Sequence, residues 1–166
     1  FTPDVALKDG GTDAINTYLS LMKQTDTALE SLVRYFSEQE EKTIIVFFGD
    51  HQPTDSVVEP VLQANGKSGA TLTDEEQKDR YVVPFVIWAN FDIAEEQDVE
   101  ISANYLSGKV MQTAGLPLSP YQQYLEEFRQ EIPVISAEET RYTDESVSGE
   151  DTLLSYQKLQ YYMLFQ

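Results

Sequence analysis

The feature that most constrains the fold is the uninterrupted apolar run TIIVFF, Thr43 to Phe48, in which every residue is β-branched or aromatic. Apolar and polar residues do not alternate there, so the strand that it forms is expected to be buried on both faces. Strands of this kind are typical of parallel sheets that helices cover. A second such run, Phe85 to Ala89 (FVIWA), follows later in the chain. The sequence therefore predicts an α/β protein with a mostly parallel sheet.

Helical spacing and capping residues predict the segments around these strands. Thr73 and Glu76 form a capping-box pattern, and Ser119-Pro120 is typical of a helix start. The predicted helices cover residues 13–36, 74–80, 103–114 and 120–132. The apolar tail 153–165 is expected to pack back on the body. We find no internal repeat and no domain boundary, and we expect residues 1–166 to form a single partial domain.

Composition narrows the possible functions. The chain has 29 acidic and 11 basic residues, a net charge of −18, which disfavours binding to nucleic acid and basic-patch docking to membranes. It has no cysteine, which excludes disulfides, thiolate zinc sites and a cysteine nucleophile within this chain. No apolar run approaches the roughly 18 residues that span a bilayer. Because the sequence begins with Phe1, we expect it to be part of a longer protein that carries any membrane anchor upstream.

Gly49-Asp50-His51 directly follows the first strand and includes the only histidine. In open α/β sheets, ligands bind outside the carboxyl ends of the strands. Asp50 offers a hard oxygen and His51 a borderline nitrogen, a pair that suits Mn²⁺, Zn²⁺ or Mg²⁺ better than Ca²⁺. A catalytic metal site needs three or more protein ligands, so the pair amounts to half a site. An alternative stays open, in which Asp50 caps the next turn and His51 packs beside it.

Several stretches of the chain resemble the C-terminal part of the lipoteichoic acid synthase-like phosphoglycerol transferases, members of the sulfatase and alkaline phosphatase superfamily. The stretches are TIIVFFGDHQP, RYVVPFVIWANFDI, SANYLSGKVMQTAGLPLSPYQQYLEEFRQEIPVIS and the closing YQKLQYYMLFQ. The helix INTYLSLMKQTDTALESLVRYF is similar to the one that precedes the metal-binding strand in that family. The resemblance implies the C-terminal portion of an alkaline phosphatase-like sandwich, with a mostly parallel sheet flanked by helices.

The resemblance also implies a chemistry. Asp50 and His51 match two family ligands of a divalent metal, Mn²⁺ or Mg²⁺ and alternatively Zn²⁺. The threonine nucleophile, the other ligands and a substrate-binding histidine are expected upstream. Family members move glycerol phosphate from phosphatidylglycerol to an acceptor hydroxyl on a glycan or polymer, at the extracellular face of the cytoplasmic membrane. We therefore expect this chain to be inactive alone, to have the missing N-terminal part of its domain as partner, and to self-associate through exposed strand edges.

Gln52-Pro53 stands where sulfatases proper usually have a glycine after the Asp-His pair. This departure favours the phosphoglycerol transferase branch over sulfate ester hydrolysis. A phosphodiesterase, phosphatase or sulfatase of the same superfamily remains an alternative. A further alternative is a non-catalytic acidic domain that binds components of the cell envelope. The upstream sequence separates an enzyme from this last alternative, because a threonine at a strand-to-helix turn with an acid on another strand end supports an enzyme. Transfer and hydrolysis are separated by whether the full-length protein transfers glycerol phosphate or releases it to water.

Overall fold

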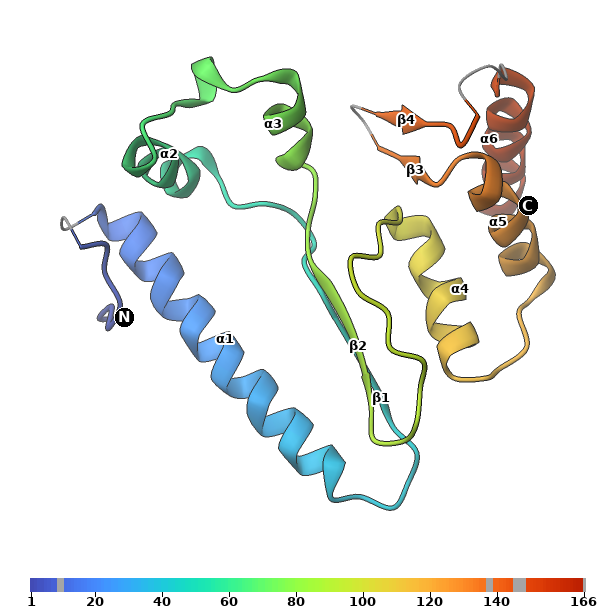
Figure 1. Cartoon of the computed structure of the whole chain (residues 1–166), viewed down its shortest axis with the longest axis horizontal. Helices are drawn as coiled ribbons and strands as arrows, with labels where there is room; N and C mark the ends of the chain where they lie inside the picture. The colour runs from blue at the N-terminus through green and yellow to red at the C-terminus, as the bar shows by residue number, and fades with distance from the viewer. Residues whose placement is uncertain (9–10, 137–138, 145–148, 166) are drawn as a thin grey trace. The chain divides into compact units, whose positions relative to one another are not determined.

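The computed structural model describes residues 1–8, 11–136, 139–144 and 149–165, and the chain forms two compact units (Figure 1). The first unit, Phe1–Asp92, contains α1 (Asp13–Ser37), β1 (Ile44–Phe48), α2 (Asp55–Ala64), the 3₁₀ helix η1 (Gly69–Thr71), α3 (Asp74–Asp79) and β2 (Phe85–Ala89). The second unit, Ile93–Gln166, contains α4 (Ala103–Thr113), α5 (Pro120–Glu131), β3 (Val134–Ile135), β4 (Thr140–Arg141) and α6 (Glu150–Phe165). Among the described residues, none of the helices has the length and apolarity needed to cross a bilayer.

The α/β class is confirmed, whereas the parallel sheet is not observed in this chain. β1 pairs with β2 in an antiparallel ladder that runs from Ile44 opposite Ala89 to Phe48 opposite Phe85. β3 and β4 are also antiparallel, so every strand pair in the described part of the chain is antiparallel. A mostly parallel sheet therefore stays a prediction, since an unalternated apolar run indicates burial on both faces and does not fix the direction of the neighbouring strand.

The expected burial of the first strand is only partly found. The residues of β1 are half-buried, and Phe48 at its end is 55% exposed. Val86 on β2 is 51% exposed. A two-stranded ribbon leaves one hydrogen-bonding edge of each strand open and is marginally stable by itself. These two strands therefore carry more apolar surface than the described residues bury.

Asn90, the residue after β2, fixes the connection between α1 and β1. Its Nδ2 donates to the carbonyl oxygens of Phe36 and Glu41, at 3.0 and 2.9 Å. The same amide donates to the carbonyl of Gln39 at 3.1 Å. Its Oδ1 accepts from the backbone N–H of Thr43 at 2.8 Å. One side chain thus holds the end of α1, the following loop and the start of the ribbon together.

The predicted helices α1, α3, α4 and α5 are confirmed within one or two residues at their ends. The capping box that opens α3 is present, because Thr73 Oγ1 accepts from Glu76 N–H at 3.2 Å and the Glu76 carboxylate accepts from Thr73 N–H at 2.9 Å. Ser102 precedes α4 without capping it. Its hydroxyl instead donates to the carbonyl of Ile135 and accepts from the N–H of that residue, which ties α4 to β3.

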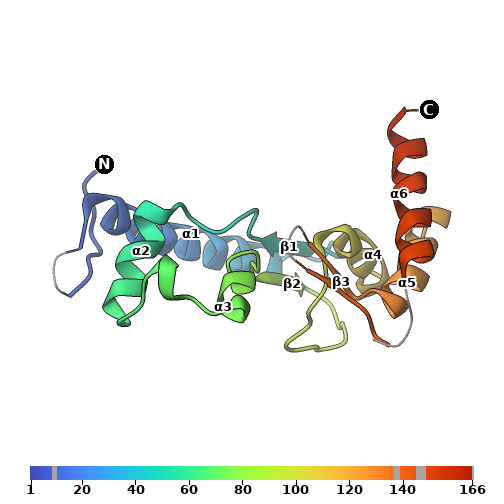
Figure 2. The same cartoon turned by 90° about the horizontal axis from the view of Figure 1, so that it is seen from above.

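Helix α2 was missing from the predicted elements. Its interior contains Pro60, which lacks an N–H and ordinarily indicates a helix end. The signals that favour the helix are Thr54 at its start, Asn65-Gly66 at its end and apolar residues at helical spacing between them. α2 packs against α1 (Figure 2) and leads into η1 and α3.

An aromatic core holds the second unit together. Its buried members are Tyr105, Leu125, Phe128, Ile132 and Tyr156. The rings of Phe128 and Tyr156 lie 4.6 Å apart between centroids, so α6 packs on α5 through Tyr156 as expected for an apolar tail. Tyr105 is 1% exposed and donates its hydroxyl proton to the carbonyl of Ile132 at 2.6 Å. The last residues of α6 remain exposed, from Tyr161 to Phe165.

Tyr105 is expected to make the chain sensitive to alkali. Burial raises the pKa of Tyr105 from its ordinary value of 10 to about 12. The unfolded chain therefore ionises first, and stability that is fully present below pH 10 should fall by up to about 3 kcal/mol as the pH rises toward 12. Tyr105→Phe should unfold more easily at neutral pH, by about 1–3 kcal/mol, because the buried Ile132 carbonyl loses its donor. The stability of this variant should also fall less steeply above pH 10 than that of the wild type. Urea titrations between pH 8 and pH 11 measure both effects. If the free energy of unfolding of Tyr105→Phe falls with pH as steeply as that of the wild type, Tyr105 is not the cause of the alkaline destabilisation.

Candidate functional site

The loop that carries Asp50 and His51 begins where the β1–β2 ladder ends. Gly49 N–H donates to the carbonyl of Pro84 at 3.1 Å, which extends the pairing by one residue beyond β1. A Cβ on Gly49 would lie 3.0 Å from the Cβ of Val83, so glycine allows this close approach of the two chain segments. The predicted metal ligands are therefore held at the end of a paired strand.

Asp50 and His51 present two ligand atoms side by side. Oδ2 of Asp50 lies 3.5 Å from Nε2 of His51. Nδ1 of His51 lies 2.9 Å from the carbonyl oxygen of Gln52. A carbonyl oxygen only accepts hydrogen bonds, so Nδ1 is the donor in this contact and Nε2 is the ring nitrogen left to bind a metal. The other oxygen of Asp50, Oδ1, accepts from the backbone N–H of His51 at 2.9 Å, the local bond that the turn-capping alternative predicts.

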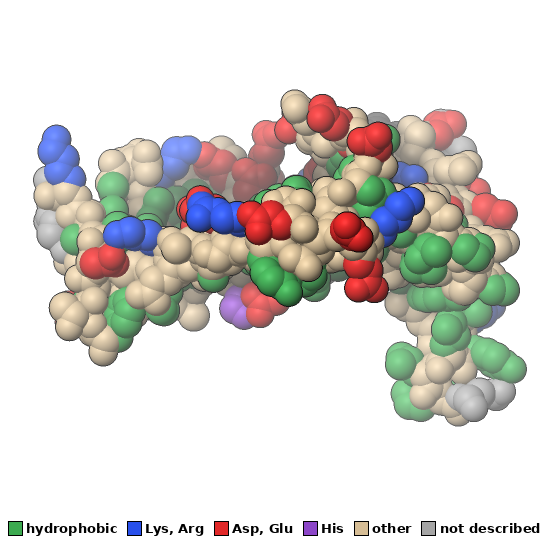
Figure 3. Space-filling model, turned by 90° about the horizontal axis from the view of Figure 1, so that it is seen from below, with side chains coloured by type: hydrophobic (Ala, Val, Ile, Leu, Met, Phe, Trp, Pro, Cys, Tyr) green, Lys and Arg blue, Asp and Glu red, His purple; other side chains and the backbone are tan. Residues whose placement is uncertain are grey.

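This pair fits a divalent metal. Two ligand atoms that each lie about 2.1 Å from one ion are separated by roughly 3.4 Å around a tetrahedral ion such as Zn²⁺ and by roughly 3.0 Å around an octahedral ion such as Mg²⁺, against the observed 3.5 Å. The side chains of His51 and Asp50 are 75% and 84% exposed, so an ion can reach both. In Figure 3 the histidine side chain, in purple, is visible at the surface next to acidic side chains. One oxygen and one nitrogen are a suitable donor set for Mn²⁺, Mg²⁺ or Zn²⁺.

The described residues do not complete a metal site around this pair. Among the residues that the structure describes, no group of three or more His, Asp or Glu side chains lies close enough to hold an ion. The nearest acids along the chain have other partners. Asp55 Oδ1 accepts from the guanidinium of Arg80 at 2.7 Å, and Glu59 Oε1 accepts from the N–H of Gly69 at 2.8 Å.

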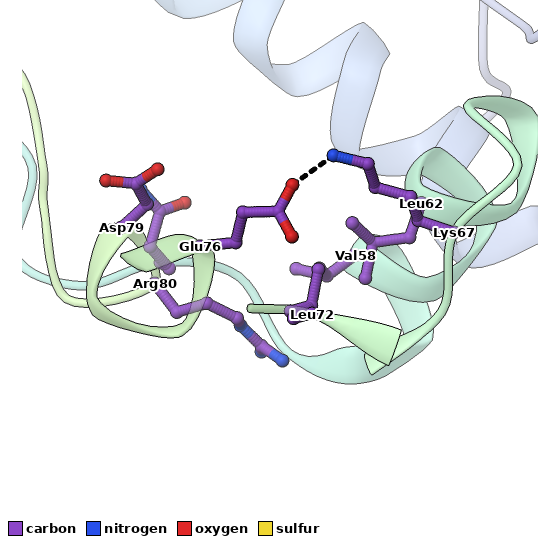
Figure 4. A pocket seen from close by; sticks show the side chains of 8 residues that line it. Val58, Leu62, Lys67, Leu72, Glu76, Asp79 and Arg80 are labelled. Carbon is purple, nitrogen blue, oxygen red and sulfur yellow. Dashed lines mark hydrogen bonds and ion pairs between the residues drawn. The ribbon is translucent and has the colours of Figure 1, made fainter. Parts of the chain in front are cut away.

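A pocket of about 260 Å³ adjoins the loop and was not foreseen from the sequence. Figure 4 shows it between α2, the loop that follows α2, and α3. Its lining residues are Gln52, Val58, Leu62, Lys67, Leu72, Glu76, Asp79 and Arg80. Gln52 joins the pocket to the metal pair, since it follows His51 directly and its amide donates to the carbonyl of Val82. Finding the pocket requires α2, the helix that the sequence analysis missed.

The family of the chain follows from comparison with known proteins. A family model described as Sulfatase matches residues 2–116, more than half of the chain, including Asp50 and His51. The chain belongs to the sulfatase family. The resemblance to the sulfatase and alkaline phosphatase superfamily is thereby confirmed.

Two known proteins are similar to parts of the chain. A Rhizobium meliloti (strain 1021) protein, whose name refers to cyclic beta-1,2-glucan modification, is 28% identical over 124 residues, which are 72% of this chain and 19% of that protein. The Streptococcus pyogenes phosphoglycerol transferase GacH, solved in complex with sn-glycerol-1-phosphate, shares the fold with a TM-score of 0.52. Its identity is 18%, over 76% of this chain and 32% of that one. The chain thus spans about a fifth of the length of the Rhizobium protein and about a third of the length of GacH.

The half-site should bind metal weakly. For this chain we expect Mn²⁺ to bind with a Kd on the order of 1 mM or above, because a tight site needs at least three protein ligands. Mn²⁺ should broaden the NMR signals of His51 before others, and Asp50→Ala should remove that preference. Asp26→Ala, a substitution of an exposed aspartate on α1, is the matched control and should change nothing. Micromolar binding that disappears in Asp50→Ala would mean that this chain supplies a complete site.

Proposed function

We propose that this chain is the C-terminal part of the catalytic domain of a divalent-metal-dependent phosphoglycerol transferase. The proposed reaction moves glycerol phosphate from phosphatidylglycerol to a hydroxyl of a glycan or polymer. The observation that carries the proposal is the pairing of Asp50 Oδ2 with His51 Nε2 at the end of β1, in a chain of the sulfatase family. The names of the two relatives support glycerol phosphate as the transferred group and a β-1,2-glucan as one acceptor class.

Asp50 and His51 would hold the ion, Mn²⁺ or Mg²⁺ and alternatively Zn²⁺. When bound, such an ion lowers the pKa of a coordinated hydroxyl and neutralises charge that develops on a phosphodiester. The chain's own contribution is positioning. The Gln52 carbonyl keeps the proton on Nδ1 of His51, and the His51 N–H holds one oxygen of Asp50 so that the other faces Nε2. The nucleophile is proposed to be a threonine elsewhere in the domain.

The remainder of the domain is the proposed partner of the exposed ribbon. Phe48 and Val86 are each more than half exposed, and within the described part of the chain both strands have an open edge. Further strands on these edges would cover the apolar side chains and build the mostly parallel sandwich, with residues 1–166 as one part of a single domain. In their absence, the same edges favour self-association.

The proposed location is the extracellular face of the cytoplasmic membrane, because the donor is a membrane lipid. A tether would hold the domain there despite the net charge of −18. A phosphodiesterase, phosphatase or sulfatase is the second candidate, because the family match concerns the sulfatase family as a whole and does not separate transfer to a hydroxyl from transfer to water.

The test uses a longer form of the protein that contains the rest of the domain, with phosphatidylglycerol and a β-glucan. We expect diacylglycerol to be released and glycerol phosphate to appear on the glucan. Asp50→Asn should lower kcat by at least about 100-fold, since loss of even an outer-sphere partner of a metal ligand typically costs 10–100-fold. Asp26→Asn should have no effect, and the 166-residue chain alone should show no turnover.

Two outcomes would overturn the proposal. Glycerol phosphate found only free in solution would make the enzyme a hydrolase. Full activity in Asp50→Asn would mean that the pair does not belong to the catalytic centre.

A further inference from the structure

The pocket beside the metal pair is built from two kinds of surface. One wall is aliphatic and consists of Val58, Leu62 and Leu72. The rim is polar, and in Figure 4 Lys67 and Glu76 reach toward one another beside this wall. Such a combination suits a ligand that has apolar C–H surface on one side and hydrogen-bonding groups at its edge.

The charges of the pocket favour a neutral ligand. Its lining contains two cations, Lys67 and Arg80, and two carboxylates, Glu76 and Asp79. Both cations already have acidic partners: Lys67 pairs with Glu76, and Arg80 with Asp55 at 2.7 Å. The Lys67 ammonium accordingly lowers the pKa of Glu76 and keeps it ionised. A phosphate would have to displace these partners and approach both lining carboxylates, whereas a neutral ligand could hydrogen-bond to the pairs as they stand.

The size of the pocket favours a small ligand. Pockets for drug-sized molecules measure about 300–1,000 Å³, so a volume of about 260 Å³ suits a single ring. A hexose has this size, an apolar C–H face, and hydroxyls that both donate and accept hydrogen bonds. The rim offers both kinds of partner, with the guanidinium of Arg80 as donor and the carboxylate of Asp79 as acceptor.

We propose that this pocket binds one neutral sugar unit of the acceptor glycan. Gln52 lines the pocket and follows His51 directly, so a sugar there would lie at the edge of the candidate metal centre. The role as acceptor subsite rests on the proposed function. Binding of the sugar itself does not, because it needs neither metal nor turnover.

The experiment titrates this 166-residue chain, without metal, with a β-1,2-linked glucose disaccharide and follows the backbone amides by NMR. We expect saturable shifts at Leu72, Glu76 and Arg80. Arg80→Ala should weaken the affinity at least five-fold. The matched control Arg34→Ala removes an arginine that pairs with Glu30 on α1 and should leave the affinity unchanged. Leu72→Trp, which fills the aliphatic wall, should also weaken binding, and it provides a second test if Arg80→Ala unfolds.

Parallel titrations with sn-glycerol 1-phosphate and inorganic phosphate decide between ligand classes. Shifts of the pocket amides by these anions and not by the disaccharide would overturn the proposal, as would no shift with any probe. Equal disaccharide binding by wild type, Arg80→Ala and Leu72→Trp would place the sugar elsewhere and also overturn it. If the disaccharide binds as expected while the longer protein transfers no glycerol phosphate, the proposed function fails and the sugar site stands.

Discussion

The candidate centre depends on the antiparallel ladder between β1 and β2. The ladder is held at both ends by contacts that lie outside the strands. At one end Asn90 binds Thr43 and the segment that leaves α1, and at the other Gly49 N–H binds the carbonyl of Pro84. Because the pairing continues to Gly49, the loop that follows starts from a defined position. Asp50 and His51 then need only short local hydrogen bonds to bring Oδ2 and Nε2 to 3.5 Å.

Within the part of the chain that the structure describes, the β1–β2 ribbon and the loop after β1 lack two things, a cover for their apolar side chains and a third metal ligand. The ribbon exposes Phe48 and Val86, which a sheet interior would bury, and the metal pair has no third ligand among the described residues. Both deficits would be met if further strands of the domain paired with the open edges, because ligands in α/β sheets gather at the ends of neighbouring strands. The chain's small share of its relatives' length agrees with this account. Apolar burial and metal coordination would then depend on the same contact.

The sequence predicted most elements, its errors have physical causes, and Asp50 and His51 stay predicted ligands. Strands β1 and β2 and most helices were found because periodicity and capping are local properties. α2 was missed because Pro60 resembles a helix end, and the antiparallel pairing of β1 with β2 was not foreseen because burial does not encode strand direction. The adjacency of Asp50 and His51 is visible in the sequence. The role of the Gln52 carbonyl in setting the ring tautomer is not, because it depends on the backbone conformation of the loop. The pocket depends on α2 and was missed with it.

Anomalous diffraction at the manganese edge tests the central claim most directly, on crystals of a longer form that contains the complete domain, grown with Mn²⁺. The account predicts one strong peak within about 2.0–2.2 Å of both Asp50 Oδ2 and His51 Nε2, with further ligands from outside this chain. A manganese peak elsewhere in the domain, with Asp50 and His51 bonded only to each other and to their own loop, would contradict it.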